Sequence, residues 1–168
     1  MTQHYHSLAS CFKGWDGYQQ HLVQGIASLT PEQLHLRAAP QLRSLGEQMA
    51  HIIAVRTRWL LLDLHEGGTE LEVLMTWDGW SAQGGEQMPP PHSAAELVTG
   101  LQTTWQVIEE ALHRWTTADL EEVFPPSFPG EESFTRQYVI WHLIEHDLHH
   151  GGELSFTLGM HRLTAIPI

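Results

Sequence analysis

The stretch RQYVIWHLIEHDLHHGGEL, residues 136–154, decides how the chain folds. His142, His146 and His150 are four residues apart, so on a helix each lies about one turn from the next, on one face. Apolar residues border this polar stripe on both flanks: Leu143, Ile144 and Leu148. A histidine stripe between core residues is expected to face the interior, where an imidazole without a partner is unfavourable.

A metal ion would supply that partner. His146 and His150 can chelate one ion, and His51 is the only histidine at the middle of a second core helix. Three protein ligands would leave at least one position for water or substrate, as catalytic sites do. Spacing alone does not separate this hypothesis from interior histidines that are merely hydrogen-bonded. For His142, His149 and Glu153 we favour a supporting or solvated role over direct ligation.

The rest of the chain predicts an all-α fold, a four-helix bundle in one domain spanning residues 1–168. Apolar residues at helical spacing run from Leu8 to Ile26, and the last helix begins between Ser133 and Arg136. The capping boxes Ser44/Glu47 and Ser93/Glu96 begin the second and third helices, which end near Leu64 and Thr116. No strand pattern stands out.

A long connection, residues 66–92, joins the second and third helices. Loops of this length inside a compact domain are uncommon and are often functional, so the segment is a candidate lid over an active site. A plain crossover pinned by tryptophans is an equally good interpretation. Trp59, Trp77, Trp80 and Trp141 could line an apolar pocket, but we favour core packing for them.

Composition excludes several classes of protein. A formal net charge of −12 without any basic strip argues against nucleic acid as a partner. Neither a secretory signal nor a run of membrane-spanning length stands out, so we expect a soluble, cytoplasmic protein. With Cys11 as the single cysteine, histidines and carboxylates would have to hold any metal. The second helix is also apolar on a flank around Val55, which suggests a homodimer interface.

The segments HLIEHDLHHGGEL and RSLGEQMAHIIAVRTRWLL together resemble the DinB/YfiT-like superfamily over essentially the full chain. The resemblance implies a four-helix bundle, commonly a homodimer, in which three histidines bind a divalent metal. Carried over position by position, the ligands are His51, His146 and His150. The family pattern often has Arg and Gln after the paired histidines, whereas this chain has Gly151, Gly152 and Glu153. Two glycines could permit close packing, mark a kink or end the helix.

Relatives in that superfamily include metal-dependent enzymes that use low-molecular-weight thiols such as bacillithiol or mycothiol. The resemblance therefore implies a thiol S-transferase acting on electrophilic small molecules, with Zn²⁺ or Ni²⁺ expected first and Fe²⁺ or Mn²⁺ as alternatives. Candidate bases or orienting groups are Glu145, Asp147, His149 and Glu153. Two other functions stay open: a metal-dependent hydrolase, and a stress-response protein that binds metal or a ligand without catalysis.

Overall fold

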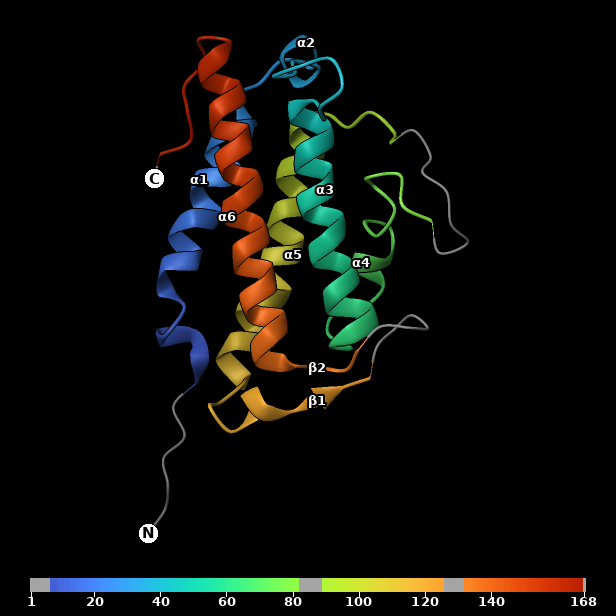
Figure 1. Ribbon diagram of the computed structural model, residues 1–168, viewed down its shortest axis with the longest axis vertical. Helices are drawn as coiled ribbons and strands as arrows, with labels where there is room; N and C mark the ends of the chain where they lie inside the picture. The colour runs from blue at the N-terminus through green and yellow to red at the C-terminus, as the bar shows by residue number, and fades with distance from the viewer. Residues whose placement is uncertain (1–6, 82–88, 126–131, 168) are drawn as a thin grey trace.

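The protein is described by a computed structural model that covers residues 7–81, 89–125 and 132–167. Four long helices run side by side along the long axis (Figure 1). Their bounds are α1 Lys13–Ala27, α3 Leu45–Arg58, α5 Ala94–Arg114 and α6 Arg136–Met160. The contacts pair α1 with α5 and α6, and α3 with α5 and α6. The all-α class predicted from the sequence is confirmed.

Short elements precede the first long helix and connect the others. They are the 3₁₀ turns Leu8–Ser10 and Asp119–Glu121, α2 Pro31–Leu34, the π-helical turn Trp59–Asp63, α4 Thr69–Glu72, and the strands β1 Val123–Phe124 and β2 Phe134–Thr135. The two strands pair antiparallel, with Val123 opposite Thr135. This pair was not predicted, because two residues are too few to establish an alternating pattern.

Both predicted capping boxes are present. Ser44 accepts a hydrogen bond from the backbone N–H of Glu47, whose side chain accepts one from the Ser44 N–H. Ser93 and Glu96 repeat this arrangement at the start of α5. Each box satisfies donors that the first helical turn leaves free, and it thereby fixes where the helix begins.

The second predicted helix changes its winding before it ends. Regular α-helix stops at Arg58, and the π-helical turn carries the chain to Asp63. His65 and Gly67 then adopt positive φ angles of 55° and 84°, which turn the chain away from the helix axis. The flank predicted for a partner is partly covered within the chain itself, since Val55 is buried.

The last helix continues through both glycines, so the proposed helix end at Gly151 is not observed. A Cβ at Gly151 would lie 2.0 Å from the Tyr18 hydroxyl oxygen of α1, whereas one at Gly152 would meet nothing within 4 Å. Gly151 is therefore the position that lets α1 approach α6 closely, which is one of the roles expected for the pair.

A buried polar network crosses the apolar core. Arg56 of α3 and Asp147 of α6 are both fully buried, and Nη2 donates to Oδ2 over 2.6 Å. Trp15 donates from Nε1 to the same carboxylate over 2.7 Å, and Gln19 accepts from Arg56 Nη1 over 2.8 Å. Thr104 of α5 is a further partner of the guanidinium. All four long helices thus contribute to one network, which fixes their mutual register.

Candidate metal centre

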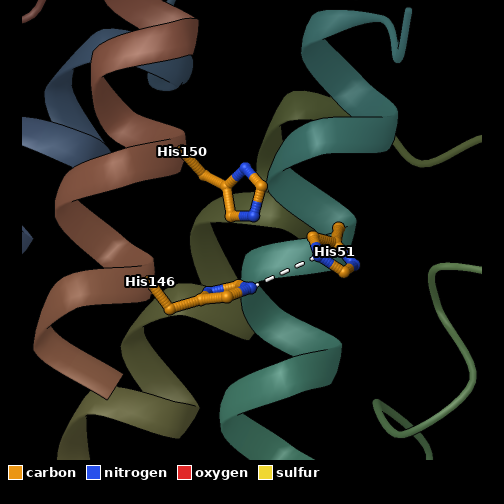
Figure 2. A group of neighbouring side chains, drawn as sticks. All are labelled: His51, His146 and His150. Carbon is orange, nitrogen blue, oxygen red and sulfur yellow. Dashed lines mark hydrogen bonds between the residues drawn. The ribbon is translucent and has the colours of Figure 1, made fainter. Parts of the chain in front are cut away.

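Three histidine rings from two helices meet at one point. His51 lies on α3, and His146 and His150 lie one turn apart on α6, with the rings turned toward one another (Figure 2). The potential ligand atoms of the three all lie within 4.8 Å of one another. The ring centroid of His51 is 5.0 Å from that of His146 and 4.9 Å from that of His150. The convergence expected from the sequence is present.

The spacing between two of the nitrogens suits a shared ion. Nε2 of His51 and Nε2 of His146 are 3.3 Å apart. Two nitrogens on a tetrahedral Zn²⁺, each at about 2.0–2.1 Å, are separated by about 3.3–3.4 Å. Such an ion would need little movement of these two rings. The same distance also fits a hydrogen bond between the two imidazoles. The tautomer of each ring, that is, which nitrogen carries the proton, therefore has to be determined.

Hydrogen-bond partners assign those tautomers. Nδ1 of His51 is 2.9 Å from Oδ2 of Asp78, and an ionised carboxylate only accepts, so Nδ1 carries the proton and Nε2 has a free lone pair. The proton between the two Nε2 atoms then belongs to His146. Its Nδ1 becomes an acceptor, and this atom is buried without a hydrogen-bond partner among the described residues.

Burial favours the neutral forms of His146 and His150. It is the largest cause that lowers the pKa of His146, to about 2, with the charges of His150 and His51 acting in the same direction. Burial also lowers the pKa of His150, although its hydrogen bond with Glu153 opposes the effect. Neutral imidazole is the form that binds metal, so His146 and His150 need not lose a proton to bind an ion at neutral pH.

Carboxylates hold the outer nitrogens of two of the three rings. Besides Asp78 on His51, Oε2 of Glu153 lies 2.7 Å from Nδ1 of His150. Residues of α3 hold both carboxylates, because Arg58 pairs with Asp78 over 2.9 Å and the Gln48 amide donates to Glu153. Burial acts to raise the pKa of Asp78, but hydrogen bonds from His51 and Arg58 outweigh it and the pKa falls. This is the usual support around a metal-bound histidine.

The other polar residues of the stripe lie outside the cluster of His51, His146 and His150. His142 is half-buried; its ring is tilted against that of Trp59, with centroids 5.0 Å apart, and stacks on that of Tyr138, with centroids 6.1 Å apart. Glu145 is exposed and lies 3.8 Å from His142. His149 is exposed, with Nε2 3.4 Å from Glu153, and these two with His150 form a second group of potential ligands.

Asp147 does not belong to this site. Its carboxylate is fully buried and accepts hydrogen bonds from Arg56 of α3 and Trp15 of α1. The expectation that Asp147 orients a ligand or acts as a base is therefore wrong. A position between His146 and Leu148 rotates away from the stripe by about 100°, which is enough to place it in the core.

Comparison with known families adds an independent observation. The sequence profile of the DinB superfamily matches residues 15–154. The chain belongs to the DinB superfamily. This confirms the resemblance noted in the sequence, and the matched range contains both helices that carry the three histidines.

The fold of this DinB chain has a close counterpart among solved structures. It is similar to the crystal structure of a DinB-like protein from Bacillus cereus ATCC 10987, with a TM-score of 0.69 and 22% sequence identity. The similarity covers 98% of this chain and 99% of the other. At this identity the likeness concerns the fold alone. No curated protein matches the chain.

One pocket of the DinB chain is lined by His150, and a second is lined by Arg58, which pairs with Asp78. The first, of about 440 Å³, is lined by residues that include the polar His150 and Glu153 and the apolar Leu42 and Phe156. The second, of about 760 Å³, is lined by residues that include Arg58, Trp59, Trp80, Phe134 and Tyr138. None of the helices in the described parts of the chain combines the length and apolar character of a membrane span.

The four tryptophans have different environments. Trp59 and Trp80 line the larger pocket, as one of the two interpretations expected. Trp77 packs against the core and stacks on His92 at 4.0 Å. Trp141 is 62% exposed, so core packing is wrong for this residue. The segment 66–92 contains α4 and reaches His51 through Asp78, while residues 82–88 lie outside the described residues.

Three supporting residues were missed from the sequence: Gln48, Arg58 and Asp78. Gln48 and Arg58 lie three residues before and seven residues after His51, which places all three on one face of α3. That spacing could have identified them. No sequence signal indicates Asp78, because its contact depends on how the connection folds back.

Proposed function

We propose that this protein is a metal-dependent enzyme in which His51, His146 and His150 hold one divalent cation, with Zn²⁺ or Ni²⁺ preferred. The observation that carries the proposal is the convergence of three rings from two helices, with ligand atoms within 4.8 Å. Fe²⁺ and Mn²⁺ are alternatives. When bound, such an ion would stabilise a thiolate or a hydroxide and leave a position open for it.

The reaction we favour is transfer of a low-molecular-weight thiol to an electrophilic small molecule. The thiol gives up its proton, its sulfur forms a bond to an electrophilic carbon, and the leaving group departs with the bonding electrons. The pocket beside His150 offers space for a reactant, and both polar and apolar side chains line it. Membership of the DinB superfamily is compatible with this chemistry.

The contacts of the candidate catalytic groups suggest different roles for them. Glu153 is engaged by Gln48 and His150, and although burial opposes it, the His150 hydrogen bond lowers the pKa of Glu153. Such a carboxylate is a weak proton acceptor, so we assign Glu153 to orienting His150. His149 is exposed beside it and is our first candidate to take the thiol proton, with Glu145 as the second.

Turnover with and without thiol tests the proposal. Zinc-loaded protein would be incubated with chlorodinitrobenzene and a panel of low-molecular-weight thiols that includes bacillithiol and mycothiol, and thioether and chloride would be measured. We expect thiol-dependent product formation that is lost in His146→Ala and kept in His113→Ala, a variant of an exposed histidine on α5. Turnover without thiol would instead favour the hydrolase. Metal binding without either reaction would favour a non-catalytic stress-response role.

We further propose that the four long helices form the bundle that the resemblance implies and that a second copy pairs with the protein in the cytoplasm. Exposed apolar side chains of α6 support an interface there: Trp141, Leu148 and Phe156. Light scattering on a size-exclusion column measures the assembly. A mass of one chain over the micromolar range would contradict the dimer.

A further inference from the structure

We propose that Asp78 is a positioning residue that couples metal binding at His51 to the folding of residues 66–81, the first part of the connection, onto α3. The inference rests on the proposed metal site and adds a part of the chain that the three histidines do not include. Its basis is a continuous set of contacts from Nδ1 of His51, through one carboxylate, to the backbone of the connection.

The carboxylate of Asp78 has hydrogen-bond partners on both of its oxygens. It is 7% exposed and lies between His51 Nδ1 at 2.9 Å and two guanidinium nitrogens of Arg58 at 2.9 and 3.0 Å. The backbone N–H of Trp80 donates to Oδ1 over 3.1 Å. A carboxylate buried to this extent is unfavourable unless each oxygen is paired, so it favours the geometry in which His51 donates.

Arg58 ties the same segment to α3 at two further points. Its Nη1 donates to the carbonyl oxygen of Met75 over 3.0 Å, and its guanidinium lies 5.1 Å from the ring centre of Trp80. Residues 75–80 are thus fastened to α3 by Arg58 and His51. Of these two side chains, His51 is the one that would also contact an ion.

The chemistry of the imidazole makes this contact sensitive to metal. A cation on Nε2 of His51 leaves the ring's only proton on Nδ1, the tautomer that donates to Asp78. The cation also makes that N–H a better donor, so the bond to Asp78 strengthens. In return, the carboxylate makes the ring a better ligand, an effect that is commonly about 10–100-fold in affinity. Metal affinity and the closure of the connection must therefore rise together.

Within the described residues, the other carboxylate beside the three histidines provides no comparable link. Glu153 holds His150 in a similar way, but it belongs to the same helix, so that bond orders no additional segment. Asp78 is 27 residues from His51 in the sequence. Because Asp78 comes from a distant segment, its hydrogen bond to His51 lets a bound ion stabilise the folded position of that segment.

Two measurements test the coupling, on the wild type, two Asp78 variants and one control variant. Zn²⁺ affinity would be measured by competition with a chromophoric chelator for the wild type, Asp78→Asn and Asp78→Ala, with Glu72→Ala as a control for an exposed acid of the same connection. Hydrogen exchange of residues 72–81 would be followed with and without Zn²⁺.

We expect Asp78→Ala to bind Zn²⁺ about 10–100-fold more weakly than the wild type, with Asp78→Asn between them and Glu72→Ala unchanged. Zn²⁺ should slow exchange of residues 72–81 in the wild type and have little effect there in Asp78→Ala. Equal affinities in the wild type and both Asp78 variants, or exchange that Zn²⁺ does not alter, would overturn the coupling alone. Wild-type protein that binds no Zn²⁺ would overturn the proposed metal site and the coupling with it.

Discussion

Arg56 and Asp147 form an ion pair with no exposed surface, and Asp147 is the direct neighbour of His146 in the sequence. The pair therefore fixes the rotation of α6 about its axis. One side of the helix turns Asp147 into the core, and an adjacent side presents His146 to His51. Two charges inside the core are unfavourable unless both remain paired, so the structure depends on each partner.

Asp147→Ala should lower the free energy of unfolding by about 3–5 kcal/mol, because it leaves the Arg56 guanidinium buried without a counter-charge. Urea denaturation of the metal-free protein measures the change. The double variant Arg56→Met with Asp147→Leu should recover most of the loss, since it removes both charges. A loss below about 1 kcal/mol in the single variant would show that water reaches Arg56.

The two adjacent glycines of α6 should respond in opposite directions to alanine. Gly151→Ala places a Cβ 2.0 Å from the Tyr18 hydroxyl and should lower the melting temperature. Gly152→Ala meets nothing within 4 Å and should stabilise the helix by up to about 1 kcal/mol. Adding Tyr18→Phe to Gly151→Ala should restore only part of the stability, because the ring carbon Cζ remains 2.9 Å from the new Cβ. Equal melting temperatures for the two single variants would contradict the close packing of α1 on α6.

Stability of the metal-free protein should fall as the pH drops below about 6.5. The pKa of His146 is lowered to about 2 by burial, so between these values the unfolded chain binds a proton that the folded protein does not. Each such histidine contributes up to about 1.4 kcal/mol per pH unit, and His142 and His150 shift in the same direction. Urea midpoints from pH 7 to about pH 4.5 measure the slope, above the range in which most carboxylates titrate. His146→Ala should have a shallower slope, and a flat wild-type profile would refute the burial of these rings.

Saturating Zn²⁺ should raise the melting temperature of the wild type, since an ion that binds only the folded state stabilises it by mass action. A free Zn²⁺ concentration of a thousand times the dissociation constant raises the free energy of unfolding by about 4 kcal/mol. The His113→Ala control should show the same increase, and His146→Ala should show little. Scanning calorimetry checks this, and an equal increase in His146→Ala would place the ion elsewhere.

The sequence predicts the long helices well because their signals are local. The serine and glutamate pairs at residues 44–47 and 93–96 mark helix starts without reference to any other part of the chain. Spacing likewise places His146 and His150 on one face, and the resemblance supplies His51. The change of winding at Trp59 was not predicted, because a π-helical turn has the same apolar pattern as the α-helix it follows.

The parts of the site that the sequence does not reveal depend on tertiary structure. Asp78 lies in a stretch rich in glycine and acids, where nothing distinguishes it from Glu70 or Glu72 until the connection folds onto Arg58. Asp147 is the opposite case. Its position beside His146 in the sequence suggests a role in the site, but its carboxylate binds Arg56 in the core instead.

The central claim, that imidazoles from α3 and α6 share one ion, is tested most directly by X-ray absorption at the zinc edge. The protein would be purified without a histidine tag, loaded with Zn²⁺ and dialysed. We predict one ion per chain, with three imidazole nitrogens at about 2.0–2.1 Å. Protein that retains no zinc, or a spectrum left unchanged by His51→Ala and by His146→Ala, would contradict the claim.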